Sequence, residues 1–188
     1  MANNTGKDQS SKSTRGNGDI FFVAFLTLLV AVGLYYKSSQ ANDIVPKGYL
    51  DFEHFYHFYI SQHQDVTCRR LHFIGTTITF LIALWEPKIM VSLVMSAYLS
   101  FAVFNYTTHF AHGWIELLTM FMSFQVFMRY FTKSWIKGFV TLLIPYGFAW
   151  VGHFFFELNR PATFIYPLYS LLGDFRLWGE IALQMRKF

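Results

Sequence analysis

Long runs of apolar residues constrain this chain more than any other feature of its sequence. The first run, IFFVAFLTLLVAVGLYY at residues 20–36, contains no charged residue and reaches the short end of the length that crosses a bilayer. Four more runs follow, at about residues 72–86, 89–106, 115–132 and 135–157. Runs of this length predict an all-α protein, a polytopic membrane helical bundle with about five transmembrane helices.

The composition of the chain agrees with an integral membrane protein. Hydrophobic residues make up 54% of the 188 residues and aromatic residues 21%, whereas charged residues make up only 14%. A soluble domain carries about 25% charged residues. The net charge of +4 is modest, and no basic cluster interleaves with aromatic residues, which argues against nucleic-acid binding. The single cysteine, Cys68, excludes an intramolecular disulfide and a cysteine-based zinc site.

The segments outside the runs are polar or amphipathic. Residues 1–19 are rich in Ser, Asn and Gly, which predicts a disordered tail before a transmembrane anchor at 20–36. Aromatic residues recur at helical spacing within residues 49–63 and predict an amphipathic helix at the membrane interface. Two prolines interrupt the segment after residue 157, which predicts a further interfacial helix before a C-terminal tail at 181–188.

Alternation of five spans collects polar residues at one face of the membrane. The linker after the first span, the loop after the third and the end of the fifth all lie on that face. They contribute five of the seven histidines together with a glutamate and an arginine, namely His63, His72, His109, His112, His153, Glu157 and Arg160.

The spacing of these residues leaves a metal site and simpler interpretations open. His153 and Glu157 lie four residues apart and share a helix face, where they could bind a metal or form a hydrogen-bonded pair at the helix end. His63 and His72 would lie on opposite faces of a continuous helix. A break near Asp65 could bring them together. A histidine-rich site with a carboxylate suits zinc or non-haem iron.

Other polar residues at this face also have two interpretations. His109 and His112 are further candidate metal ligands, or loop residues at the level of the lipid headgroups. Arg70 and Arg160 could hold a carboxylate bidentately, or pair with lipid phosphates. Asp174 could pair with the arginine two residues later, or fix an arginine or histidine from behind.

Two motifs resemble the yeast-type 2-hydroxy-fatty-acid dioxygenase family. They are H-x8-H-x2-GT at residues 63–76 and Y-x2-AW-x2-H-x3-E-x-NRPATF at 146–164, followed by YPLYSLLGDF. The resemblance covers about residues 49–180 as a dioxygenase-like membrane domain. It implies an enzyme of fatty-acid α-oxidation in the endoplasmic reticulum, which removes one carbon from a 2-hydroxy fatty acid with Fe(II) and molecular oxygen.

The resemblance also implies roles for individual residues. His63, His72 and His153 are the implied iron ligands, with Glu157 as a further ligand or an orienting base. Arg70 or Arg160 would hold the substrate carboxylate at the membrane face. The expected partners are therefore a fatty-acid substrate and the surrounding membrane lipids.

An accessory subunit is the alternative function. The anchor at 20–36 lies outside the resemblance, and the stretch between Gly75 and Tyr146 is longer than expected for compact members of the family. Both features favour a non-catalytic subunit of a larger membrane complex, with the mitochondrial inner membrane as its location and other membrane proteins as its partners.

Overall fold

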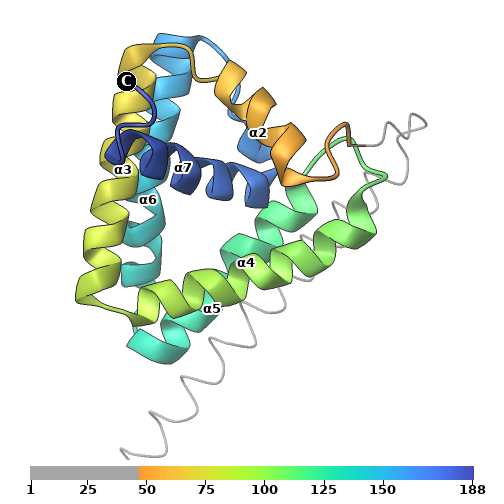
Figure 1. Cartoon of the computed structure of the whole chain (residues 1–188). Helices are drawn as coiled ribbons and strands as arrows, with labels where there is room; N and C mark the ends of the chain where they lie inside the picture. The colour runs from red at the N-terminus through yellow and green to blue at the C-terminus, as the bar shows by residue number, and fades with distance from the viewer. Residues whose placement is uncertain (1–46) are drawn as a thin grey trace, which may run out of the picture. The chain divides into compact units, whose positions relative to one another are not determined.

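A computed structural model describes residues 47–188, which form helices and connecting loops without a strand (Figure 1). The all-α prediction is confirmed for this part of the chain. The predicted tail at 1–19 and the predicted anchor at 20–36 lie outside the described residues. The helices are α2 (Phe52–Ser61), α3 (Val66–Trp85), α4 (Lys88–Thr107), α5 (Trp114–Thr132), α6 (Trp135–Val151), the π-helical turn η1 (Gly152–Glu157), the 3-10 turn η2 (Ala162–Phe164) and α7 (Pro167–Ala182).

Side-chain caps fix where three of the helices begin. The Asp51 carboxylate accepts a hydrogen bond from the backbone N–H of His54 at the start of α2. Asp65 accepts two, from the N–H groups of Thr67 and Cys68, at the start of α3. The Ser134 hydroxyl accepts one hydrogen bond, from the backbone N–H of Lys137, at the start of α6. Such caps satisfy N–H groups that have no partner within the helix. The Asp65 cap explains why α3 begins at Val66, several residues before the predicted run at 72–86.

The long helices pack in two pairs, α3 along α6 and α4 along α5 (Figure 1). Gly75 lets the first pair approach closely. A methyl group on Gly75 would lie 3.1 Å from Cβ of Phe148 and 3.3 Å from Cα of Pro145. Small residues at helix crossings allow such contact between backbones. This contact brings the first turns of α3 beside the end of α6.

Helices α2 and α7 carry an aromatic core. Phe55 and Tyr59 on α2 are buried against Tyr166 and Tyr169, at and just after the start of α7. The amphipathic helix expected within residues 49–63 is therefore confirmed as α2. Helix α7 also contacts α3, α4 and α5, so that it crosses the space between the two helix pairs.

Within residues 47–188, two helical stretches are long and apolar enough to cross a membrane. They are α4 (Lys88–Thr107) and the continuous stretch of α6 and η1 (Trp135–Glu157). The predicted runs at 72–86 and 115–132 are also helical, as parts of α3 and α5. Neither α3 nor α5 meets the same criterion of length and hydropathy, so a bundle of five spans is not confirmed.

Candidate metal centre

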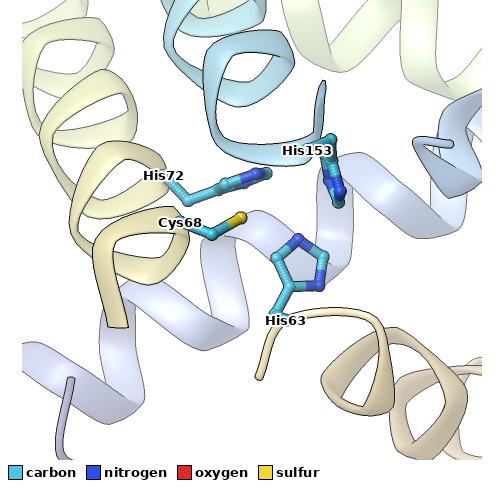
Figure 2. A group of neighbouring side chains, drawn as sticks. All are labelled: His63, Cys68, His72 and His153. Atoms are coloured by element: carbon cyan, nitrogen blue, oxygen red, sulfur yellow. The ribbon is translucent and has the colours of Figure 1, made fainter. Parts of the chain in front are cut away.

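Three buried histidines from three separate elements meet at one point (Figure 2). His63 lies in the loop after α2, His72 in the second turn of α3 and His153 in η1. Their ring centroids lie 4.6 Å (His63 to His72), 4.7 Å (His63 to His153) and 5.0 Å (His72 to His153) apart. These are the three histidines that the family resemblance implies as ligands, and the structure brings them together.

Each of the three imidazole rings has an oxygen acceptor at its Nδ1 atom. Nδ1 of His63 lies 2.6 Å from the carbonyl oxygen of Tyr59, and Nδ1 of His72 lies 2.6 Å from Oδ1 of Asp174. Nδ1 of His153 lies 2.7 Å from Oδ1 of Asn159. A carbonyl or carboxylate oxygen can only accept, so each Nδ1 carries the proton and donates. When such a ring is neutral, its lone pair sits on Nε2.

The Nε2 atoms of His63 and His72 are buried, and neither has a hydrogen-bond partner among the described residues. Burial lowers the pKa of His63 well below its usual value, and the adjacent His72 and His153 rings lower it further. A neutral imidazole with Nδ1 bound to an oxygen and Nε2 free is the form in which histidine binds metal ions. The donor set therefore fits a metal ion, which would satisfy the two unpaired nitrogens.

Asp174 and Asn159 connect the candidate metal centre to the surrounding helices. Oδ1 of Asp174 also accepts a hydrogen bond from the Tyr59 hydroxyl, at 2.5 Å. The interpretation of Asp174 as a residue that fixes a histidine from behind is thus confirmed, and Arg176 pairs with Glu53 and Glu180 instead. Asn159 donates from Nδ2 to the carbonyl of Gln62 at 3.0 Å, which orients its Oδ1 toward His153.

The backbone of η1 presents His153 to the other ligands. Helix α6 widens into a π turn from Gly152, and Leu158 ends the turn in the left-handed conformation with φ 55°. A π turn inside an α-helix is rare and is frequent at functional sites. A Cβ on Gly152 would lie 2.9 Å from Sγ of Cys68, so only glycine lets η1 approach α3 this closely.

Cys68 is the residue of this centre that sequence reasoning missed. It is buried, and its Sγ lies within the same 4.8 Å group of candidate ligand atoms as the three histidines (Figure 2). A lone cysteine excludes a site built only from cysteines, but not a mixed one. The available signal was its spacing of four residues from His72, which places both side chains on one face of α3.

The other predicted site residues lie outside this group. Glu157 accepts a hydrogen bond from the Asp65 N–H at 2.6 Å, at the positive end of α3, where a carboxylate is stabilised by the helix dipole. His109 and His112 lie in the loop between α4 and α5, with their rings against Phe110.

The two predicted carboxylate-binding arginines do not line the cavity beside the histidines. Arg70 is exposed, with its guanidinium 5.7 Å from the ring centroid of Phe188. Arg160 is exposed in the loop after η1. Long basic side chains typically place their carbon stems on apolar surface and keep their charged ends in a polar medium, and the exposure of both arginines agrees with this.

A cavity of about 400 Å³ extends from the histidines between the two helix pairs. His63, His72 and His153 line one end of it with Asp174, and the remaining wall is mainly Leu, Phe, Ile, Met and Ala side chains from α4, α5, α6 and α7. This volume falls within the range of small-molecule pockets, about 300–1,000 Å³. An apolar cavity that ends at a candidate metal centre can hold a hydrocarbon chain with its polar group at the metal.

Comparison with known proteins gives one finding. A family model described as 2-hydroxy-palmitic acid dioxygenase Mpo1-like matches residues 49–186, a stretch that contains all three histidines. A search of the curated proteins and a search of the solved structures returned no match. The resemblance read from the two sequence motifs is therefore confirmed.

Proposed function

The chain belongs to the Mpo1-like family, and on that basis we propose that it is an iron(II)-dependent membrane dioxygenase that shortens 2-hydroxy fatty acids by one carbon. The observation that carries this proposal is the set of three buried histidines, each with Nδ1 bound to an oxygen acceptor. His63, His72 and His153 would hold the metal through Nε2. Asp174, Asn159 and the Tyr59 carbonyl keep the rings in the required orientation.

The reaction balances with molecular oxygen alone. The 2-hydroxy acid R–CH(OH)–COOH and one O₂ give R–COOH, CO₂ and water, with four electrons passing from the two carbons to oxygen. A ferrous ion held by the three histidine nitrogens would supply the activation of oxygen. The mainly apolar wall of the cavity would keep water away from the reacting carbons.

The cavity supports a long acyl chain as the substrate, and Ser170 supplies a polar contact for its head. Ser170 lies one turn before Asp174 on α7, lines the cavity, and its buried hydroxyl has no partner among the described residues. An unpaired buried hydroxyl is costly. We therefore assign it to the carboxyl or hydroxyl group of the substrate. Arg70 and Arg160 would instead pair with lipid phosphates.

The deciding experiment is turnover of 2-hydroxypalmitate by the full-length protein, purified with and without Fe(II). We expect the acid one carbon shorter and CO₂ from the iron-loaded protein only. His153→Ala should abolish both metal binding and turnover. His57→Ala is the matched control, because His57 is exposed on α2 and outside the cluster. Absence of a shortened product from the iron-loaded wild type contradicts the proposal.

Cys68 favours a second candidate function, the non-catalytic accessory subunit. If its sulfur joins the three nitrogens, the site is a closed four-ligand set, which is typical of structural zinc. Cys68→Ser separates the two functions. The enzyme keeps its metal and its turnover in this variant, whereas the structural site loses most of its metal affinity. Migration of the native protein with a large membrane complex would also favour the subunit.

The two stretches that can cross a membrane support a membrane location. We propose the endoplasmic reticulum for the enzyme and the mitochondrial inner membrane for the accessory subunit. Fractionation of cells that express the tagged full-length chain tests this assignment.

A further inference from the structure

The cavity beside the histidines reaches the surface of α6. Leu142, Tyr146, Ala149 and His153 recur at helical spacing and line its interior wall. A second row on the adjacent face of the same helix also lines the cavity, yet is substantially exposed: Phe139 (51%), Leu143 (68%) and Trp150 (43%). Side chains that line a cavity and remain exposed mark its mouth. The mouth therefore lies along α6, on the side of α5.

Contacts between α5 and α6 close one end of this mouth. The rings of Phe121 and Phe139 touch, with centroids 5.8 Å apart. Just beyond them, a Cβ on Gly138 would clash with Oε1 of Gln125 and lie 3.2 Å from Cβ of Met128, so the two helices are tightly packed there. The opening therefore extends from the Phe121–Phe139 contact toward the histidine end of α6.

The other end of the mouth is closed by the segment after η1. Phe164 of η2 lines the cavity and packs against Trp114 at the start of α5, with ring centroids 5.3 Å apart. Leu118 borders the opening from α5. The side chains named at the opening, from Phe121 and Phe139 to Leu143, Trp150 and Phe164, are apolar, which suits a hydrocarbon medium and not water.

The depth of the mouth places it within a bilayer if α6 crosses one. At 1.5 Å per residue, Leu143 lies about 12 Å from Trp135 and about 21 Å from Glu157, the two ends of the candidate span. A hydrocarbon core is about 30 Å thick. The mouth thus opens toward the interior of the membrane, while His153, one turn before Glu157, lies near the headgroups.

We propose that the gap between α5 and α6 is a lateral portal, through which a single-chain fatty acid enters the cavity directly from the bilayer. A fatty acid in a membrane already has its carboxyl group at the headgroups and its chain in the core. The cavity offers the same arrangement, with the histidines at one end and apolar side chains along its length. The substrate therefore slides sideways without turning over or passing through water. This inference rests on the proposed fatty-acid substrate.

Photolabelling from vesicles tests the portal. The full-length protein is reconstituted in phosphatidylcholine vesicles with a 2-hydroxy fatty acid that carries a diazirine near its methyl end. Label on the α7 peptide, where Leu171 and Phe175 line the cavity, is quantified by mass spectrometry at increasing times after mixing. Leu143→Trp should slow the labelling about tenfold, the effect of a barrier raised by roughly 1.4 kcal/mol. Phe139→Ala, which widens the mouth, should accelerate it.

Val140→Trp is the matched control. Val140 lies one turn from Leu143 on the same helix and is 47% exposed, but it does not line the cavity. Its variant should label at the wild-type rate, and equal metal content in all variants shows that they fold. Equal labelling rates for Leu143→Trp and Val140→Trp overturn the portal. Labelling requires no turnover, so a protein without dioxygenase activity still passes or fails this test.

Discussion

One oxygen atom of Asp174 contacts two side chains at the candidate metal centre. Its Oδ1 accepts from Nδ1 of His72 and from the hydroxyl of Tyr59, and Tyr59 in turn offers its carbonyl to His63. Two of the three candidate ligands thus depend on this one contact. A carboxylate in this position also raises the basicity of the ligand nitrogen.

Asp174→Asn should therefore weaken metal binding by about 10- to 100-fold, since outer partners of metal-bound histidines contribute that much. Competition with a chelator of known affinity measures the change. Glu180→Gln is the control on the same helix, because its carboxylate contacts Arg176 and Arg186 and no histidine. Equal affinities in the two variants would contradict the role assigned to Asp174.

His63 makes the stability of the metal-free protein depend on pH. Burial holds its pKa well below the usual 6.5, so the folded protein keeps the ring neutral where the unfolded chain binds a proton. The unfolded state then binds more protons, and the free energy of unfolding falls as the pH drops below about 6.5. Above that pH the ring is neutral in both states, so His63 causes no loss of stability there.

Thermal unfolding of the metal-free protein between about pH 7.5 and about pH 5 checks this prediction. His63→Gln should remove part of the loss of stability on acidification. His57→Gln, at an exposed position, should retain the wild-type dependence. The same pH profile in all three proteins would show that His63 is not the titrating group.

At the scale of single elements, most helices could be predicted but the shape of η1 could not. Apolar runs predicted α4, α5 and the continuous stretch of α6 and η1 to within one residue, because periodicity is a local signal, but the run predicted for α3 began six residues after Val66. The π turn at Gly152 and the left-handed Leu158 have no such signal. At this turn Gly152 packs against Cys68, a contact between residues far apart in the chain that a local pattern cannot indicate.

Gly152→Ala tests this contact. Its Cβ would lie 2.9 Å from Sγ and 3.3 Å from Cα of Cys68, and overpacking of this kind costs about 1–3 kcal/mol. Because His153 is the next residue, metal affinity should fall together with stability. Gly147→Ala is the control, since nothing lies within 4 Å of its added methyl group, and it should be neutral or stabilise the helix by up to about 1 kcal/mol. Denaturant unfolding compares the two variants.

At the scale of the whole molecule, a buried ion pair fastens the start of the described chain to the helix pair α4–α5. Nζ of Lys47 contacts the Glu116 carboxylate and lies 3.1 Å from the carbonyl oxygen of Thr107. The two charged side chains are 0% and 1% exposed. Removal of one partner from such a pair leaves an uncompensated buried charge, which costs about 3–5 kcal/mol.

We expect Glu116→Leu to lower the free energy of unfolding by that amount, and the double variant Lys47→Met with Glu116→Leu to recover much of it. Glu53→Gln breaks the exposed pair with Arg176 and should cost no more than about 1 kcal/mol. Unfolding curves of the four proteins form the test. A double variant as unstable as Glu116→Leu alone would contradict it.

The candidate site could be predicted only as far as local patterns extend. The family motifs pointed to His63, His72 and His153 as ligands. The alternation of spans suggested that five histidines gather at one membrane face, whereas three meet in the structure. Whether a histidine reaches the centre depends on packing between distant helices, such as the approach of α3 to α6 at Gly75. Periodicity says nothing about such contacts, so His109 and His112 could not be separated from the others.

The order of the three histidines along the chain makes a bound ion a cross-link. All of α4, α5 and α6 lie between His72 and His153, so an ion held by both closes a loop that contains most of the cavity wall. Binding to the folded state alone stabilises it, by about 2.7 kcal/mol when the free ion is at 100 times its dissociation constant. The melting temperature of this protein should therefore rise with metal concentration. With less free ion, a larger fraction of the chain would be unfolded and open to proteolysis.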